Sequence, residues 1–242
     1  MDIKKLTGKQ VVGLRGYQAG IRWEGVRMNI SLISSYLAEN AETALDIGCN
    51  QGLVTCAMAM SGTKATGIEM QEKYLRMARK VAIRLNTSAS FENKKLSLED
   101  LKGMEPHDIV SFLSVHHQMA SADGLKKANI FLRSLAAKAK KQFFFQPACI
   151  SAKYGNHSPN ISDNDIAAYE DYFCGILKND FEYYALIGFA QNDIPKNEPM
   201  RPLMLFSHVP IQLNKTVSFA HNLKEIKIAS TNKPRLTDIL RH

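Results

Sequence analysis

Short apolar runs alternate with longer segments of helical periodicity along most of this chain. The apolar runs predict five strands, at residues 43–48, 64–69, 90–96, 108–114 and 141–147. Helical periodicity occupies three of the intervals between them, at residues 52–60, 71–86 and 125–139. Strands that alternate with helices are typical of a parallel sheet whose two faces are covered by helices. The pattern therefore predicts an α/β fold.

The segments on either side of this pattern extend the prediction. Residues 23–40 are expected to form a helix that leads into the first strand, and residues 162–180 a later helix with Ser162 or Asp163 as its N-cap. Residues 181–190 and 201–208 are expected to pair as a hairpin at one sheet edge, because their connection is polar and rich in proline. The sequence thus predicts a Rossmann-like, doubly wound, seven-stranded, mostly parallel sheet with an antiparallel C-terminal edge strand.

Length and charge suggest one domain with extended ends. The chain has 242 residues, which suffices for one substantial core. Residues 1–41 are expected to be a helical segment and a candidate lid over the functional site, residues 42–209 the α/β domain, and residues 210–242 a basic tail. The net charge of +8 favours an anionic partner, although a solvated basic tail is the plainer explanation.

Composition bears on the compartment and on metal binding. No run approaches the roughly 18–20 apolar residues of a membrane span, and the N-terminus lacks the apolar core of a signal peptide. We therefore expect a cytoplasmic protein without a transmembrane segment. The four cysteines lack the paired spacing of zinc ligands, so we expect reduced thiols and no metal site.

A glycine turn follows the first predicted strand. Asp46, Gly48 and Gly52 form the pattern D-x-G-x-x-x-G, in which glycine lets a ligand approach the main chain closely. The next helix would begin near Gln51 and direct free N–H groups at that ligand. Asn50 stands where a dinucleotide fold needs its second glycine, which argues against a pyrophosphate ligand.

An acidic residue ends the second predicted strand. Glu69 lies roughly 20 residues beyond the turn, where nucleotide-binding folds place the carboxylate that accepts both ribose hydroxyls. A plain turn followed by a surface glutamate is the alternative explanation for this pair of features. Together, the turn and Glu69 indicate an adenosyl ligand without a pyrophosphate.

These residues resemble the first motifs of class I S-adenosylmethionine-dependent methyltransferases, and the resemblance extends from Glu42 to about His208. It implies a methyltransferase domain at residues 42–209 with S-adenosyl-L-methionine as its cofactor. The turn would face the methionine end of the cofactor, Glu69 would hold the ribose, and Met70 would border the adenine. Leu98 and Glu99 would contact the adenine base, with Asp100 a weaker choice. The implied cofactor-binding set is Asp46, Gly48, Cys49, Asn50, Gly52, Glu69, Met70, Leu98, Glu99 and Ser114.

The fourth predicted strand ends in the sequence "SVHHQ". Ligands of doubly wound sheets lie beyond the carboxyl ends of the strands, so Ser114, His116 and His117 are expected to border the transfer site. One histidine is expected to act as a proton acceptor or anion binder, while the other packs or caps. A zinc site that includes Cys149 is conceivable, but no ligand spacing supports it. The [N/D]-P-P-[Y/F/W] tetrapeptide of the amino methyltransferases that flip adenine is absent from this position.

A looser resemblance concerns the acceptor. "RWEGVR", "SVHHQ" and residues 181–208 are similar to segments of the phosphate methyltransferases, which include O-antigen chain-terminating and small-RNA methylphosphate capping enzymes. Such an acceptor requires cations, and arginine suits phosphate because its planar fork donates two hydrogen bonds. Arg22 and Arg201 are the candidates, although Arg22 could also solvate a helix face and Arg201 could pair with Glu198. The expected catalytic set is His116, His117, Arg22 and Arg201.

Several functions remain open from the sequence. The leading hypothesis is O-methylation of an anionic, phosphate-like or sugar-linked acceptor. A methyltransferase acting on a small-molecule hydroxyl or amine is the first alternative. The second is a non-catalytic module that keeps the fold and binds RNA or protein, but no paired aromatics of an RNA-recognition motif support it.

Overall fold

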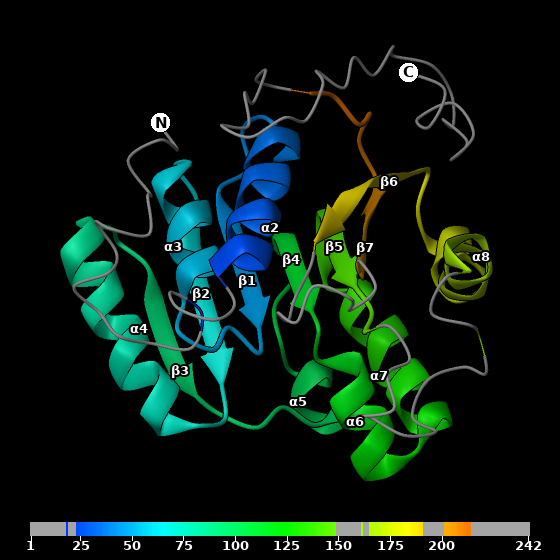
Figure 1. The fold of residues 1–242 in the computed structure, drawn as a ribbon, viewed down its shortest axis with the longest axis horizontal. Coiled ribbons are helices and arrows are strands. Elements are labelled where there is room, and N and C mark those ends of the chain that lie inside the picture. The colour runs from blue at the N-terminus through cyan, green and yellow to red at the C-terminus, as the bar shows by residue number, and fades with distance from the viewer. Residues whose placement is uncertain (1–17, 19–22, 149–160, 162–164, 191–200, 214–242) are drawn as a thin grey trace.

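A single mixed sheet forms the centre of the computed structural model, which describes residues 18, 23–148, 161, 165–190 and 201–213 (Figure 1). The strands are β1 (Thr43–Ile47), β2 (Lys64–Glu69), β3 (Ser90–Asn93), β4 (His107–Leu113), β5 (Ala139–Gln146), β6 (Tyr183–Ala190) and β7 (Arg201–Ser207). The helices are α2 (Trp23–Tyr36), α3 (Leu53–Met60), α4 (Glu72–Leu85), α5 (Leu98–Lys102), α6 (His116–Asp123), α7 (Leu125–Ala136) and α8 (Ile166–Leu177). The short 3₁₀ helix η2 (Lys178–Asp180) follows α8.

The sheet has the strand order β3-β2-β1-β4-β5-β7-β6. Strands β1 to β5 run parallel to one another, and β7 is antiparallel to both β5 and β6. This order confirms the predicted Rossmann-like, doubly wound and mostly parallel sheet with antiparallel C-terminal pairing. The antiparallel strand β7 lies one place in from the edge, and β6 forms the edge itself. The chain reverses its direction of winding between β1 and β4.

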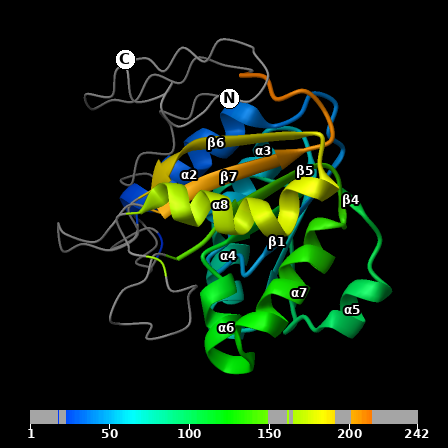
Figure 2. The same ribbon diagram turned by 90° about the vertical axis from the view of Figure 1, so that its right-hand side faces the viewer.

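Helices cover both faces of the sheet (Figures 1 and 2). Helices α2, α3 and α4 contribute to the core on one face, and α5, α7 and α8 to the core on the other. Strand β5 shows how the alternation of side chains serves both cores. Phe144 packs in the α2 face, whereas Phe143 and Phe145 pack in the opposite face. All three phenylalanines are fully buried, as expected for a strand covered on both sides.

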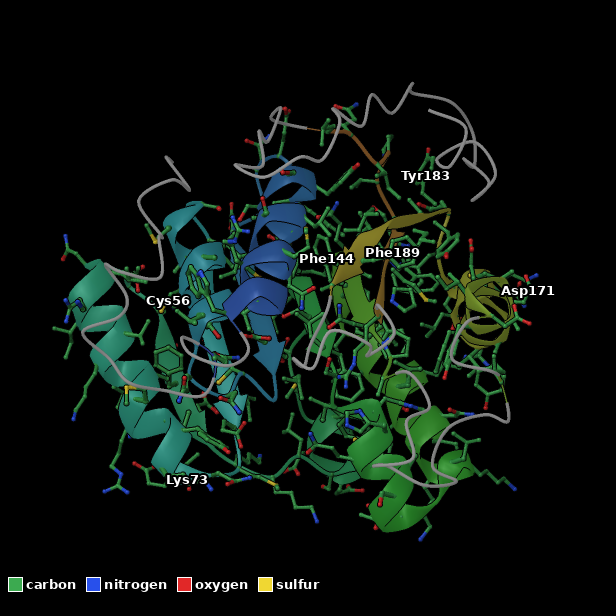
Figure 3. All side chains as sticks on the ribbon, in the orientation of Figure 1. Cys56, Lys73, Phe144, Asp171, Tyr183 and Phe189 are labelled. Carbon is green, nitrogen blue, oxygen red and sulfur yellow. The ribbon has the colours of Figure 1, made fainter. Side chains whose placement is uncertain are left out.

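Side chains show the same layering in Figure 3. The labelled Phe144 and Cys56 lie among the packed side chains between the sheet and the helices on the α2 face, whereas Lys73 lies at the lower end of α4 in this view. None of the helices in the described part of the chain is long and apolar enough to cross a bilayer.

Several element ends differ from the prediction for identifiable reasons. Strand β3 stops at Asn93 because its partner β2 ends at Glu69, the residue paired with it. Helix α2 stops at Tyr36, whose carbonyl oxygen accepts a hydrogen bond of 2.8 Å from the side chain of Gln142. Helices α5 and α6 were not predicted from the periodicity. Both are short, and a helix of one or two turns leaves little periodic signal.

Some predicted features lie outside the described residues. These are Arg22, Ser162, Asp163, the segment 149–160 with Cys149, the connection 191–200, and the tail from residue 214. The N-cap prediction for the later helix was wrong, because α8 begins at Ile166 and its N-cap is Asp165, whose side chain accepts a hydrogen bond of 2.9 Å from the N–H of Ala168.

Candidate active site

A cavity of about 610 Å³ lies where β1, β2 and β4 end. Its wall includes Asp46 from β1, Glu69 from β2 and Ser114 just after β4, together with residues of α2 and the first residue of β7. The cavity therefore occupies the carboxyl edge of the sheet at the point where the winding reverses, which is the ligand position of open α/β sheets. Its volume falls within the range of small-molecule sites.

The glycine turn requires an uncommon backbone. Gly48, Asn50 and Gly52 have positive φ angles of 71°, 53° and 72°. A Cβ atom on Gly48 would lie 2.4 Å from Cγ2 of Val115, and one on Gly52 would lie 2.5 Å from Cε1 of Phe91. Both positions therefore require glycine for conformation and for space. Gly48 lines the cavity, whereas Gly52 does not and instead forms the N-cap of α3.

Asp46 is buried beside the turn. Its two carboxylate oxygens each accept a hydrogen bond of 2.7 Å, one from the Thr55 hydroxyl and one from the Ser111 hydroxyl. Burial raises the pKa of Asp46, and these hydrogen bonds act in the opposite direction. The carboxylate is thus fixed in orientation on the wall of the cavity.

Glu69 is held in place by the main chain on both sides of it. Its Oε2 accepts a hydrogen bond of 3.1 Å from the N–H of Asn50, and its Oε1 accepts one of 2.9 Å from the N–H of Gln71. Each oxygen has a second lone pair, so the carboxylate can still accept hydrogen bonds from a ligand. Asn50 Oδ1 is also buried at this wall and accepts no hydrogen bond from the described residues.

The wall next to Glu69 is partly apolar. Met70 and Leu98 line the cavity although they are 53% and 38% exposed, and Leu96 and Phe131 lie on the same wall. An exposed apolar pair at a cavity suits a flat ring such as adenine. The predicted neighbour Glu99 is not among the lining residues and pairs with Lys102 at 2.6 Å.

Asp100, the weaker choice for an adenine contact, is occupied in capping α5. It forms a capping box with Ser97 and an ion pair of 2.7 Å with Lys94. The ion pair and the bonds to Ser97 lower the pKa of Asp100 to about 2. The capping pattern S-x-x-D was present in the sequence and could have located this short helix.

The two adjacent histidines face different surroundings because α6 begins at His116. Successive residues of a helix project about 100° apart, so only one of the two can face the cavity. His117 lines the cavity and is buried. The structure does not bring His116 to the cavity.

His116 instead packs between α7 and α8. Its Nε2 is hydrogen-bonded at 2.9 Å to Oδ1 of Asn129, whose amide donates to the hydroxyl of Tyr172 at 2.7 Å. Its ring lies edge-on to Phe145 and Phe173. Burial lowers the pKa of His116, which favours the neutral imidazole. His116 is therefore the histidine that packs, and His117 is the one that lies on the cavity wall.

The other end of the cavity is polar and comes from distant segments. Arg201, 4% exposed, lines the cavity from the start of β7. Ser114 lines it with a positive φ of 57°, and Asn29 of α2 lines it as well. Asn29 was not singled out from the sequence. A polar residue on the buried face of a helix is the signal that could have identified it.

Further polar residues that the sequence did not single out also line the cavity; they are Gln18, Gln71, Tyr74, Lys94, Lys95, Gln118, Asp123 and Lys127. Among the described residues, no group of three or more His, Cys, Asp or Glu side chains could hold a metal ion.

Comparison with known proteins finds similarity to methyltransferases. No protein-family model matches the chain. The chain is 28% identical over 138 residues to the ubiquinone biosynthesis O-methyltransferase of Dechloromonas aromatica, and the match covers 52% of this chain and 57% of that protein. It is 30% identical over 86 residues to the protein of the same name from Idiomarina loihiensis, which is 35% of each chain. The matched segments span 57% of the first relative and 35% of the second.

Solved structures agree with this fold. The bifunctional kinase-methyltransferase WbdD superposes with a TM-score of 0.64 and 20% identity over 86% of this chain and 47% of that one. The magnesium protoporphyrin IX methyltransferase ChlM from Synechocystis PCC 6803, solved with bound S-adenosylmethionine, superposes with a TM-score of 0.54 and 16% identity over 84% and 80% of the two chains.

The sheet order and the cavity at its carboxyl edge define a Rossmann-like, doubly wound domain. Within that class, the similar sequences and structures identify the chain as having the class I S-adenosylmethionine-dependent methyltransferase fold, as the sequence predicted.

Proposed function

We propose that this chain binds S-adenosylmethionine and transfers its methyl group to an oxygen atom of an anionic, phosphate-like or sugar-linked acceptor. One observation carries the proposal. A single cavity brings the glycine turn and Glu69 together with the buried Arg201 and His117. The cofactor-binding motif and the candidate acceptor groups therefore face the same space.

The residues at the turn fit this cofactor. Glu69 is fixed by two main-chain hydrogen bonds and keeps lone pairs for the two ribose hydroxyls. Asn50 Oδ1, buried and without a hydrogen bond from the described residues, can accept one from the cofactor. Met70 and Leu98 would contact the adenine ring. Similarity to methyltransferases in sequence and fold supports the same assignment.

The chemistry places modest demands on the protein. S-adenosylmethionine supplies a methyl group on a positively charged sulfur, and the acceptor oxygen forms the new O–CH₃ bond as the S–CH₃ bond breaks. The protein must hold the acceptor in line with that bond and exclude water. A phosphate oxygen is already ionised and requires no base. Arg201 would position it, because a guanidinium donates two parallel hydrogen bonds to phosphate.

A hydroxyl acceptor is the second candidate. The similar sequences are O-methyltransferases of ubiquinone biosynthesis, which favours it. A hydroxyl must lose its proton during transfer, and His117 on the cavity wall could accept that proton. Transfer to a phosphate would therefore depend on Arg201, and transfer to a hydroxyl would depend on His117.

Methyl transfer by the full chain tests the proposal. Labelled S-adenosylmethionine would be offered with a sugar monophosphate and, separately, with a catechol. A phosphate acceptor predicts that transfer survives in His117→Gln and is lost in Arg201→Gln. A hydroxyl acceptor predicts the reverse, with the His117→Gln reaction recovering at high pH.

Cofactor binding provides the control for this experiment. Glu69→Ala should abolish transfer to both acceptors by weakening cofactor binding. If calorimetry detected no binding of S-adenosylmethionine at high micromolar concentration, the proposed function would be wrong, and a non-catalytic module would be favoured instead.

A further inference from the structure

Strand β5 carries two buried glutamines that both hold helix α2. Gln142 and Gln146 project from the same face of the strand as Phe144, which is the face covered by α2. Gln142 donates from Nε2 to the carbonyl oxygen of Tyr36 at 2.8 Å and accepts at Oε1 from the N–H of Ala38 at 2.7 Å. It therefore fastens the C-terminal end of α2, away from the cavity.

Gln146 fastens the middle of the same helix by a different contact. Its amide pairs reciprocally with that of Asn29: Asn29 Nδ2 donates to Gln146 Oε1 at 3.1 Å, and Gln146 Nε2 donates to Asn29 Oδ1 at 2.9 Å. Both side chains are buried, with exposed fractions of 0% for Gln146 and 5% for Asn29. Loss of either partner would leave a buried amide without its hydrogen bonds.

Gln146 also holds Ser114 at the end of β4. The main-chain N–H of Ser114 donates to the carbonyl oxygen of Gln146 at 2.8 Å, and the Ser114 hydroxyl donates to Gln146 Oε1 at 3.0 Å. Ser114 has a φ of 57°, a left-handed conformation that is unfavourable for a residue with a side chain. The two hydrogen bonds from Ser114 stabilise that conformation.

These contacts converge behind the acceptor end of the cavity. Asn29 and Ser114 line the cavity, whereas Gln146 does not. The contacts of Glu69 and Asp46 given above involve none of these three residues. Gln146 therefore connects two wall residues at the acceptor end without taking part in the hydrogen bonds that fix the cofactor end.

We propose that Gln146 is a positioning residue for the acceptor, and that α2 is a fixed wall of the cavity rather than a lid. This inference rests on the proposed methyltransferase function. Gln146 holds the Asn29 amide and the Ser114 main chain at a set separation. Only one of the two N–H groups of the Asn29 amide donates to Gln146 in these contacts, so the other can donate to an oxygen of the acceptor.

Gln142 supplies a matched control for the first experiment. Gln142→Leu and Gln146→Leu each remove buried hydrogen bonds between β5 and α2, so both should lower the urea midpoint of unfolding. Only Gln146→Leu should raise the KM for the acceptor probe, a sugar monophosphate or a catechol, or lower kcat, by about tenfold for the lost hydrogen bonds. The dissociation constant for S-adenosylmethionine should stay within about twofold in both, because neither glutamine lines the cavity.

A reciprocal exchange separates position from stability. Asn29→Gln combined with Gln146→Asn keeps an amide pair between α2 and β5, so stability should recover relative to the Gln146→Asn single variant. The pair is shifted toward β5 and away from Ser114, so the acceptor KM should remain raised. If KM followed stability across all of these variants, including Gln142→Leu, Gln146 would be merely structural and the inference would be wrong.

The wall itself can be tested without catalysis. Trp23, the first residue of α2, is the only tryptophan in the sequence and packs against the core of that face. Quenching of its fluorescence by acrylamide should be the same with and without S-adenosylmethionine and should increase in Gln146→Leu. A clear change on adding S-adenosylmethionine to the wild type would show that α2 moves and would overturn the fixed wall. An inactive wild type that still passed this test would count against the proposed function alone.

Discussion

The two ends of the cavity are built in different ways. At the cofactor end, Asn50 with Glu69 and Thr55 with Asp46 are contacts between residues only 19 and 9 positions apart, and the bond from Ser111 to Asp46 is the longer-range contact, across 65 positions. At the acceptor end, Gln146 joins Ser114 and Asn29 across 32 and 117 positions. The cofactor end is therefore encoded largely by a local motif that also uses Ser111 of β4, whereas the proposed acceptor end exists only once β5 and α2 have joined the sheet.

Substitutions at the two ends should therefore have different effects. The cofactor end depends on a turn whose backbone is fixed by glycine, so changes there should affect folding and cofactor binding together. The acceptor end depends on side chains held by other side chains, so changes there should affect acceptor recognition with less effect on the cofactor.

The largest effect is expected at the glycine turn. Gly48→Ala must place a Cβ atom 2.4 Å from Cγ2 of Val115 and keep a positive φ. We expect the free energy of unfolding to fall by about 2–4 kcal/mol, from the left-handed conformation and overpacking together. Urea denaturation measures this loss.

Gly62→Ala is the matched control for that prediction. Gly62 also has a positive φ, of 101°, but its added Cβ would meet nothing within 4 Å. The free energy of unfolding of Gly62→Ala should fall only by the cost of the backbone conformation, about 1–2 kcal/mol. Equal losses of unfolding free energy in the two variants would mean that the Val115 side chain moves aside for the new methyl group and that overpacking contributes nothing.

Glu69→Ala should weaken binding of S-adenosylmethionine about 10- to 100-fold, since a charged hydrogen-bond acceptor is lost. Calorimetry measures this change. Glu92→Ala removes an exposed glutamate from the neighbouring strand β3 and should leave the affinity unchanged. An unaltered affinity in Glu69→Ala would place the ribose elsewhere.

Arg201→Lys should raise the acceptor KM about tenfold for a phosphate acceptor, because lysine keeps the charge but loses the bidentate fork. Steady-state kinetics at saturating cofactor would measure the change, and the cofactor affinity should be unaffected. Arg133→Lys is the control, since Arg133 forms its bidentate pair with Asp180 and does not line the cavity. An equal KM for wild type and Arg201→Lys would exclude Arg201 as the phosphate-binding group.

The smallest effect concerns the pH dependence of stability. Burial holds the pKa of His116 below its ordinary value of 6.5. Below about pH 6.5, the unfolded state therefore binds more protons at this residue than the folded state does. The free energy of unfolding declines there as pH falls, by at most about 1.4 kcal/mol per pH unit for this group. His116→Gln should flatten the decline below about pH 6.5 and change the slope little above pH 7.

Urea midpoints at several pH values would measure that slope. His107, whose pKa is also lowered by burial, stays in both proteins and should leave a residual decline. An unchanged slope in His116→Gln would mean that His116 titrates normally in the folded state.

The contrast between the two ends also explains what the sequence could predict. Strand and helix order follow from periodicity, and the turn with Glu69 follows from a local pattern, so both were accessible. The separation of His116 from His117 depends on α6 beginning at His116, which an apolar strand followed by a short helix does not reveal. The pairing of Asn29 with Gln146 depends on which helix covers which strand, and a single sequence contains no local signal for that contact.

The position of β7 in the sheet has a consequence for synthesis on the ribosome. Strand β6 is made before β7, yet in the finished sheet β7 lies between β6 and β5. The edge strand therefore has no hydrogen-bonding neighbour until the later strand has left the exit tunnel. Since chains begin to fold from their N-terminal part during synthesis, the glycine turn and β1 to β5 can assemble first. Arg201, the first residue of the inserted strand, then reaches the cavity as one of the last parts of the site to arrive.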